Sequence, residues 1–309
     1  MELRQLGYFV AVAEELNFGR TAARLRIAGP SLSQQIKALE RDLGVRLFDR
    51  DRRSVALSAH GEALLADARA LLEQADLLRR RATELAGAEA VRLGYVSWRP
   101  TDLVERAPLV VQLHIDAWVL PSHAQAERVA EGGLDLAICW TPVADLAALG
   151  LRADLLGADR LYAVAEGADT SVVRARDVAV LLDADTASWS SWNIYAARFA
   201  RDTGAELVRI EDGGITGPGF FEHVRRCGRP VLNSPKTQAG PMPQGLARRS
   251  VAGPAPYWPW YLVSRQDEAR PSVLATIRAL TDGVDAAALE LEDPDSWLPS
   301  MDPYRSSRS

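Results

Sequence analysis

The chain opens with an apolar pattern of helical period. Apolar residues recur every three or four positions, which is the spacing of one face of an α-helix. The pattern predicts an amphipathic helix over residues 2–16, and its apolar face consists of Leu3, Leu6, Phe9, Val10, Ala13 and Leu16.

Two further helices are predicted before residue 45. Asn17 can cap a short helix from about Gly19 to Arg26, because its side-chain oxygen accepts an otherwise unpaired backbone N–H. After the break at Gly29, Pro30 suits a first helical position, and Gly44 is a typical C-terminal glycine. The apolar face of this third helix is Leu32, Ile36, Leu39 and Leu43, and its polar face is Ser31, Ser33, Gln34, Lys37 and Arg41. Two short helices joined by a tight turn, the second with a polar face, predict a helix-turn-helix.

A short alternating pattern follows the third helix in residues 47–61, LFDRDRRSVALSAHG. Val55 and Leu57 alternate with polar positions after the charged turn Asp51-Arg52-Arg53, which predicts a two-stranded hairpin. A hairpin behind a recognition helix is a wing, and its arginines are expected to reach backbone phosphates or the adjacent minor groove.

A longer helix is predicted from Ala59 to about Gly87, where apolar residues alternate at spacings of four and three. Such a repeat is typical of a coiled-coil seam, whereas a helix packed on its own domain usually has a wider stripe at period 3.6. The small alanines favour close, antiparallel pairing of two copies. The seam is Leu64, Ala68, Leu71, Ala75, Leu78, Ala82 and Leu85, and its leucines are the expected dimerisation residues.

Beyond Ala90, strand-like and helix-like segments alternate, which indicates an α/β domain with mainly parallel strands. The predicted strands are Val91–Trp98, Val110–Val119, Leu134–Trp140, Leu161–Ala165, Val178–Leu182, Leu207–Ile210, Pro230–Asn233 and Tyr257–Ser264. The predicted helices are His123–Glu131, Asn193–Thr203, Phe220–Cys227 and Ser272–Asp282. Pro235–Pro259 is expected to be a long surface loop, and residues 286–309 a flexible tail.

Composition adds a charge asymmetry to this picture. The 309 residues are 48% hydrophobic and 25% charged, without an apolar run long enough to span a membrane. Residues 1–60 hold ten Arg and Lys against seven Asp and Glu, a balance of +3. Because the net charge of the whole chain is −5, the remaining residues carry a net charge of −8. A basic head on an acidic body is expected when only the head meets nucleic acid. The N-terminus lacks the features of a secretion signal, so a cytoplasmic protein is expected.

Candidate chemistry outside DNA binding is sparse. Cys139 and Cys227 form no CxxC pair, and the four histidines make no cluster, so neither a metal nor another cofactor is expected. The sequence contains no GxGxxG, GxxxxGK[ST], GxSxG or HExxH motif, which argues against an enzyme. A reversible redox switch between the two cysteines stays open as an alternative, although buried free thiols are commoner.

The N-terminal residues resemble those of LysR-type transcriptional regulators. The segments that carry the resemblance are LRQLGYFVAVAEELNFGRTAARLRI, PSLSQQIKALERDLGVRLFDR and VALSAHGEALL, and RVAEGGLDLAI is similar to a later family segment. The resemblance implies a DNA-binding homodimer, or dimer of dimers, on an interrupted palindrome, with RNA polymerase as a partner and no membrane association. Such a regulator would be nucleoid-associated.

The resemblance also implies an α+β multidomain architecture. Its parts are a winged helix-turn-helix (1–58), a linker helix (59–88) and a periplasmic-binding-protein-like effector domain (89–285). We expect two subdomains in the effector domain, one at about 90–158 plus 266–285 and the other at 159–265, with a small-molecule cleft between them. A solute-binding protein is similar in this layout, but it would have a signal peptide and no helix-turn-helix.

For DNA contacts, the family's recognition helix opens with Ser-Gln-Pro, and this chain has Ala28-Gly29-Pro30. Ser31, Ser33 and Gln34 are therefore expected to read bases, and Gln34 is suited to a bidentate contact with adenine. Phosphate or minor-groove contacts are expected from Lys37, Arg50, Arg52 and Arg53, and the DNA-binding set also includes Asn17, Arg20 and Pro30.

For the effector, the family layout implies a cleft lined by residues from both subdomains. The expected lining residues are Ser97, Trp98, Arg99, Trp140, Thr141, Trp189, Ser190, Trp192, Gly214 and Thr216. The tryptophans are the expected aromatic walls for an organic acid or aromatic compound, with core packing as the alternative.

One departure from the family concerns the segment after the first strand, where only Thr101–Ala107 stands in place of a long helix. This shortening keeps an alternative open: a regulator that needs no effector and responds to a partner protein or to redox state.

Overall fold

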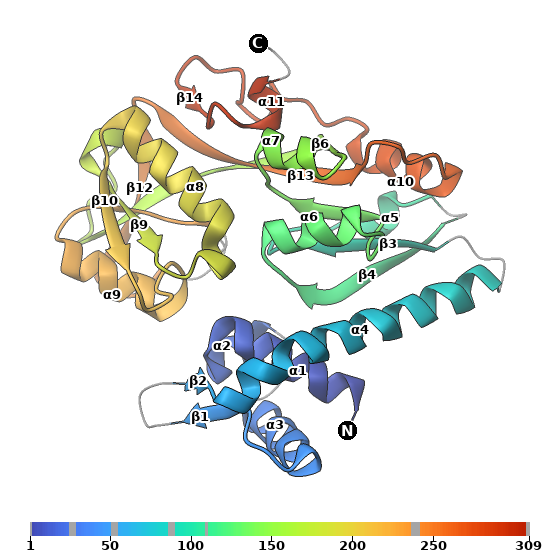
Figure 1. Cartoon of the computed structure of the whole chain (residues 1–309). Coiled ribbons are helices and arrows are strands. Elements are labelled where there is room, and N and C mark those ends of the chain that lie inside the picture. Colours follow the sequence, from blue (N-terminus) through green and yellow to red (C-terminus); the bar gives the residue numbers. More distant parts are fainter. Residues whose placement is uncertain are drawn as a thin grey trace. The chain divides into compact units, whose positions relative to one another are not determined.

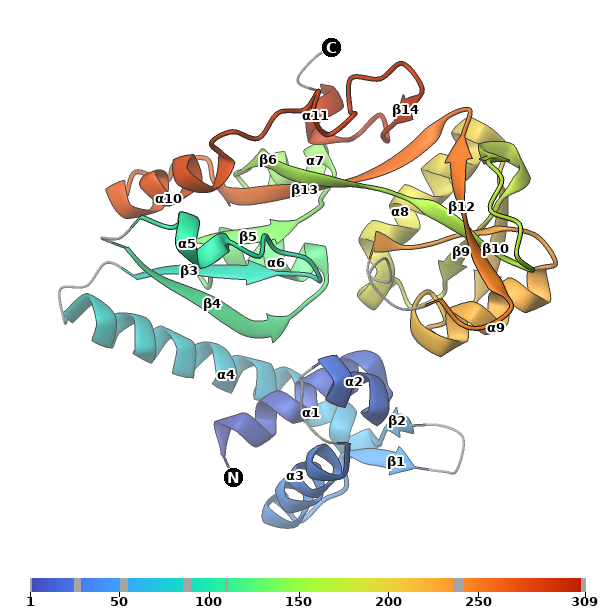
Figure 2. The same ribbon diagram turned by 180° about the vertical axis from the view of Figure 1, so that it is seen from behind.

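A computed structural model of the chain describes residues 2–24, 29–50, 55–85, 90–108, 111–235 and 242–306. The chain divides into two compact units, Met1–Ala88 and Glu89–Ser309. Figures 1 and 2 show the elements of both units from opposite sides. Within the described ranges, no helix combines the length and apolar character needed to cross a bilayer.

The described part of the N-terminal unit is a winged helix-turn-helix followed by a long helix. Its elements are α1 (Leu3–Glu15), α2 (Phe18–Arg24), α3 (Gly29–Leu43), β1 (Phe48–Arg50), β2 (Val55–Leu57) and α4 (Ala59–Leu85). Gly44 ends α3 with a positive φ of 72°, as expected of a C-terminal glycine. The core is formed by apolar residues of α1, α3 and the wing, among them Leu6, Phe9, Leu32, Ile36, Leu39, Leu47 and Phe48.

Ser58 and Gly61 determine how α4 begins behind the wing. The Ser58 hydroxyl donates a hydrogen bond to the Arg46 carbonyl oxygen (2.6 Å) and accepts one from the Gly61 amide (3.0 Å). It therefore caps the first turn of α4. A Cβ at position 61 would lie 2.1 Å from the Leu47 carbonyl oxygen. Only glycine allows this helix to approach the wing so closely.

The first sheet of the C-terminal unit has the strand order β14-β13-β5-β3-β4, and β6 also pairs with β13. Strand β3 is parallel to β4 and β5, whereas β13 is antiparallel to β5 and β6. The strands are β3 (Ala90–Tyr95), β4 (Gln112–Val119), β5 (Leu136–Cys139), β6 (Leu151–Arg160), β13 (Ala255–Arg265) and β14 (Ser296–Trp297). The helices in the same part of the chain are α5 (Leu103–Arg106), α6 (Ser122–Ala130), α7 (Val143–Ala148), α10 (Pro271–Thr281) and α11 (Pro303–Ser306).

The second sheet has the order β10-β9-β11-β7-β12-β8 and is also mixed. Its strands are β7 (Tyr162–Glu166), β8 (Val173–Arg174), β9 (Ala179–Asp183), β10 (Glu206–Ile210), β11 (Val231–Leu232) and β12 (Leu246–Ala252). The helical segments here are η1 (Ala175–Asp177), α8 (Thr186–Thr203) and α9 (Gly217–Cys227). We call residues 90–160 and 255–306 subdomain 1, and residues 162–252 subdomain 2. Figure 2 shows β6 and β13 side by side where the chain passes between the two subdomains.

The predicted strands and helices are present, but the long strand β6 was not predicted, the sheets are mixed rather than mainly parallel, and the subdomain boundary differs. Strand β13 belongs to the first sheet and not to a 159–265 subdomain, because it pairs with β6 from Tyr257 to Arg265. The predicted surface loop Pro235–Pro259 is also wrong where the structure describes it. It contains β12 and the start of β13, including the buried residues Val251, Tyr257 and Trp258. Gly253 and Pro254 lie between β12 and β13, but Pro256 and Pro259 lie within β13, so the glycine and proline content misled the prediction.

Residues 286–306 are folded, in contrast to the predicted flexible tail. Trp297 and Leu298 are each 5% exposed and Asp302 is fully buried. The prediction was wrong because this segment has no periodicity of its own and takes its order from what it packs against. The helix α8 likewise begins at Thr186 rather than at Asn193, since the Asp185 carboxylate accepts a hydrogen bond from the Ser188 amide and caps it. Helix α5 is as short as the sequence predicts.

A network of ion pairs joins the end of β13 to the start of β5. The Arg270 guanidinium lies 2.6 Å from both Glu268 and Asp135, and Arg265 lies 2.6 Å from Glu268. The Glu268 side chain is 4% exposed, and the hydrogen bonds from Arg270 lower its pKa to about 2. The ionised carboxylate is therefore favoured by folding.

We expect Glu268→Gln to lower the free energy of unfolding by about 1 kcal/mol at neutral pH, since Arg270 is half exposed and its attraction is screened. Because the folded pKa is depressed, this contribution is complete above the unfolded pKa near 4.5 and is lost as the pH falls toward 2. Urea unfolding at several pH values measures it. The exposed Glu105, replaced by Gln, is the control, and a deficit that stays constant as the pH falls toward 2 would contradict the assignment.

Candidate nucleic-acid interface and ligand cleft

Helix α3 has one buried face and one exposed polar face. Leu32, Ile36 and Leu39 are fully buried in the core of the N-terminal unit. On the other side, the exposed residues are Pro30, Ser31, Gln34, Lys37 and Arg41, and Ser33 is half-buried beside them. Spacings of three and four place these polar side chains along one stripe. A stripe of hydroxyl, amide and cationic groups offers the donors and acceptors that base edges and phosphates require.

The wing is attached to α3 through Glu40. Its carboxylate accepts hydrogen bonds from the backbone amides of Leu47 (2.9 Å) and Phe48 (3.3 Å). The Phe48 ring packs edge-on against Phe9 and Phe18, with centroids 5.6 and 5.7 Å apart. The start of β1 is thereby held by one carboxylate on the recognition helix and by two aromatic contacts.

The remaining predicted DNA-binding residues lie around this stripe. Asn17 is exposed and directly precedes α2, where its carbonyl oxygen accepts hydrogen bonds from the amide and hydroxyl of Thr21. Arg20 lies on α2 and Arg50 on β1, but their side chains are outside the described part. Arg52 and Arg53, predicted for the wing tip, lie outside the described residues altogether.

Helix α4 begins in the core of the N-terminal unit and then leaves it. Leu64 is partly buried against that core and Ala68 is 3% exposed. Further along the same seam, Leu71 is 47% exposed and Leu78 is 70% exposed. The side chain of Leu85 is outside the described part. Along the described seam, the exposed fraction of the side chains therefore rises where α4 leaves the core of the N-terminal unit.

In the C-terminal unit, the tryptophans predicted to line a cleft divide into two groups. Trp140 is fully buried and its Nε1 donates to Asp302 (2.8 Å), while Trp192 is 4% exposed and its Nε1 donates to the Leu181 carbonyl oxygen (2.8 Å). Trp98 and Trp189 are half-buried. Trp98 stacks on Trp260 with centroids 5.6 Å apart. Core packing, the alternative weighed from the sequence, describes Trp140 and Trp192 well.

A small cavity of about 30 Å³ lies where residues of both subdomains meet. Such a volume accommodates one or two water molecules, whereas drug-sized ligands occupy roughly 300 Å³ or more. The structure brings Trp189 and Trp192 to this cavity, together with Val96, Pro121, Ser122, Ser188, Ser191, Ser234, Pro235, Trp258 and Trp260. Trp258 and Trp260 were not among the predicted lining residues, although they lie in the predicted strand Tyr257–Ser264, because the sequence did not show that this strand borders the cavity.

The other predicted effector residues do not line this cavity. Ser97 is exposed, and the Arg99 guanidinium lies over the Tyr95 ring, 5.7 Å from its centroid. Thr141 is buried and Ser190 half-buried on α8, while Thr216 precedes α9. Gly214 has a packing role, because a Cβ there would lie 2.6 Å from the His223 ring.

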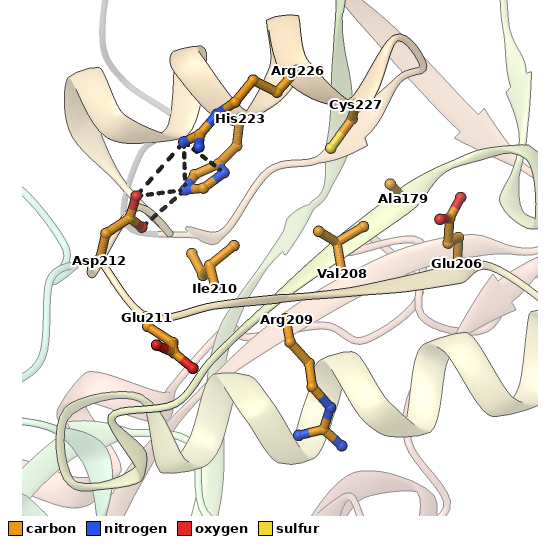
Figure 3. Close-up of a pocket in the computed structure, with 10 residues that line it drawn as sticks. All are labelled: Ala179, Glu206, Val208, Arg209, Ile210, Glu211, Asp212, His223, Arg226 and Cys227. Atoms are coloured by element: carbon orange, nitrogen blue, oxygen red, sulfur yellow. Dashed lines mark hydrogen bonds and ion pairs between the residues drawn. The ribbon is translucent and has the colours of Figure 1, made fainter.

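A larger open depression of about 710 Å³ lies between the edge strand β10 and α9 (Figure 3). Its lining includes His223, whose Nε2 lies 2.9 Å from an Asp212 carboxylate oxygen and whose Nδ1 lies 3.1 Å from the Arg226 guanidinium. Partial burial disfavours the Asp212 carboxylate, but hydrogen bonds from His223 and the Gly214 amide outweigh it and lower its pKa. These polar side chains are therefore hydrogen-bonded to one another.

The described residues give little support for a redox-active cysteine pair or for a metal site. Burial raises the pKa of the Cys139 thiol to about 12, and burial also raises that of Cys227. Both are free thiols, Cys139 on β5 of subdomain 1 and Cys227 at the end of α9 in subdomain 2. No cluster of three or more His, Cys, Asp or Glu suited to a metal ion is present in the ranges that the structure covers.

Comparison with known proteins identifies relatives of both units. The family model "Bacterial regulatory helix-turn-helix protein, lysR family" matches residues 3–62. The chain is 40% identical over 193 residues to the HTH-type transcriptional regulator TfdT of Cupriavidus pinatubonensis, covering 59% of this chain and 82% of TfdT. It is 40% identical over 149 residues to the Hca operon transcriptional activator HcaR of Escherichia coli, covering 46% of this chain and 50% of HcaR. Among solved structures, that of CbnR, a LysR family transcriptional regulator, matches with a TM-score of 0.48 and 20% identity over 91% of this chain and 98% of that one.

We expect Glu40→Ala to destabilise the N-terminal unit by about 1–3 kcal/mol, because it leaves the amides of the buried Leu47 and Phe48 unpaired. Thermal unfolding of the full chain measures the loss. Glu40→Gln is the matched control, since its amide oxygen can still accept both hydrogen bonds and should retain most of the stability. Equal losses in the two variants would show that the wing does not depend on these hydrogen bonds.

Proposed function

Because the chain belongs to the LysR family of bacterial transcriptional regulators, we propose that it binds an interrupted palindromic operator as a homodimer or dimer of dimers. The observation that supports this most is the exposed polar stripe of α3, opposite its buried Leu32, Ile36 and Leu39. A helix held by one face and polar on the other is the form in which a recognition helix enters the major groove.

The proposed division of labour follows from the position of each group on α3. Ser31, Ser33 and Gln34 lie in its first two turns, where recognition helices approach base edges, so they read sequence. The amide of Gln34 matches the N6 and N7 positions of adenine. Lys37 neutralises a phosphate. The other proposed phosphate or minor-groove contacts are Arg50, Arg52 and Arg53, and the proposed DNA-binding set also includes Asn17, Arg20 and Pro30.

Dimerisation through α4 is supported by the exposed leucines of its seam. Among the described residues Leu71 is 47% exposed and Leu78 is 70% exposed, and two exposed leucines on one face are costly in water. Burying them against the same seam of a second copy removes that cost and positions two recognition helices for two half-sites. The regulator would then act at the nucleoid in the cytoplasm, together with RNA polymerase.

We place the response to a signal in the C-terminal unit, where the two-subdomain arrangement suits a small-molecule effector. The volume of the cavity, about 30 Å³, requires the subdomains to separate before an organic acid or aromatic compound can enter. The same observation favours a second candidate, a regulator that responds to a partner protein without an effector. The raised pKa values of both thiols argue against a redox response.

We expect Gln34→Ala and Lys37→Ala to weaken DNA binding in different ways. Loss of Gln34 removes a base contact, so discrimination between preferred and altered sites should fall by about 1–3 kcal/mol at one position. Loss of Lys37 removes a phosphate contact, so affinity should fall for all sequences and the salt slope should decrease by about one. Duplexes selected from a random library, measured by fluorescence anisotropy at several salt concentrations, separate the two effects. Unchanged preference and unchanged slope would refute the interface.

We expect Leu78→Glu to shift the chain toward monomers and to weaken operator binding. A carboxylate at this position would have to be buried without a partner in the paired seam. Ala66→Glu is the matched control, because it adds the same charge to an exposed position on the opposite side of α4. Sedimentation velocity measures the assembly. Identical assembly in both variants would place the dimer contact elsewhere.

A further inference from the structure

The two subdomains share one aromatic cluster that fills the space between them. From subdomain 1, Trp258 of β13 lies 5.3 Å from Trp140, measured between ring centroids. From subdomain 2, Tyr195 and Trp192 of α8 lie 5.1 and 6.2 Å from the same Trp258 ring. The Tyr195 hydroxyl also donates to the Tyr257 carbonyl oxygen at 2.8 Å. Contacts of this kind hold the subdomains together at the position where a ligand would enter.

The C-terminal segment 293–306 contacts both sides of this cluster. On the side of subdomain 2, the Trp297 ring lies 5.1 Å from Tyr195 and 5.0 Å from Phe199, and its Nε1 donates to Asp202 at 3.3 Å. On the side of subdomain 1, the buried Asp302 accepts hydrogen bonds from Trp140 Nε1 (2.8 Å) and the Tyr261 hydroxyl (2.5 Å). In Figure 1 the red C-terminal segment accordingly lies along both β13 and the α8 side.

The main-chain attachment of this segment is slight. Strand β14 pairs with β13 through only two positions, Ser296 with Ala255 and Trp297 with Pro256. Backbone hydrogen bonds also hold it: the Ala255 amide donates to the Asp295 carbonyl oxygen (2.7 Å), and the Val143 amide donates to the Met301 carbonyl oxygen (3.0 Å). The segment lies at the end of the first sheet, so its release would leave the pairing of β13 with β5 and β6 intact. Its contacts with α8 are made by side chains.

Within the closed aromatic cluster, the indole N–H of Trp258 is left unsatisfied. Trp258 is 4% exposed, and its Nε1 has no hydrogen-bond partner among the described residues. A buried unpaired N–H is unfavourable, and water or a ligand would satisfy it if the rings separated. The closed cleft therefore has a stabilising contribution from the C-terminal segment and an opposing one from Trp258.

We propose that the C-terminal segment 293–306 is a latch that holds the two subdomains closed through Trp297 and Asp302, and that its release controls access to the cleft. With the latch in place, the space between the subdomains admits only a molecule the size of water. With the latch released, Trp258 and the serines of the cavity become accessible to a larger ligand. The consequence for transcription rests on the proposed regulatory function, but the latch itself does not.

Hydrogen exchange of the full chain, followed by mass spectrometry, tests the latch with Trp297→Ala and Asp202→Ala. Asp202 is exposed, so its replacement breaks the latch contact from the α8 side without disturbing a core. Exchange at amides of residues 188–195 and 121–126, which border the cavity, should accelerate by at least about tenfold in Trp297→Ala, and by less in Asp202→Ala. Acrylamide quenching of tryptophan fluorescence should rise in parallel.

Ile277→Ala is the control, because Ile277 is buried in α10. It should destabilise the unit without preferential exchange at the cavity. The latch is refuted if Trp297→Ala accelerates exchange evenly, as Ile277→Ala does, or if Asp202→Ala leaves exchange and quenching unchanged. Both measurements are made without DNA. A failure of the latch is thereby distinguished from a failure of DNA binding, which anisotropy with the selected duplex reports separately.

Discussion

The pairing and burial of β13 determine most of the C-terminal unit. Ten of its eleven residues are buried, and it pairs with β5, β6 and β14. Antiparallel pairing with β6 brings together the two strands by which the chain leaves and re-enters subdomain 1. The position of the first sheet relative to the second thus depends on a ladder of hydrogen bonds between residues about a hundred positions apart in sequence.

The side chains of β13 have a second consequence, which concerns the cleft. Trp258 and Trp260 project from a strand whose backbone is already fixed, so their rings occupy the space between the subdomains. Trp140, Trp192 and Tyr195 pack around Trp258, and Trp98 stacks on Trp260. Large rings buried at a junction contribute strongly to stability and leave little free volume. The cavity that remains is therefore small, and the terminal segment packs beside these rings, with Trp297 against Tyr195 and Asp302 against Trp140.

In the N-terminal unit, too, burial of one face of an element determines which side chains its other face presents. Burial of Leu32, Ile36 and Leu39 orients α3 so that Gln34 and Lys37 face outward. Glu40 connects this helix to the wing, and Ser58 with Gly61 connects the wing to α4. Each of these residues acts on the backbone of a neighbouring element. The geometry of the candidate DNA-binding surface therefore depends on a few hydrogen bonds made by residues that need not touch DNA.

The sequence by itself determined the elements whose order is local. Helical spacing, Pro30, Gly44 and the heptads of α4 specify helices and their faces without reference to distant residues, so the winged helix-turn-helix was predictable. Only the tertiary structure decided which sheet contains β13, how Trp140 and Trp258 pack, and whether residues 286–306 are ordered. Those outcomes depend on partners far away in sequence, such as Asp302 for Trp140, and no local pattern encodes them.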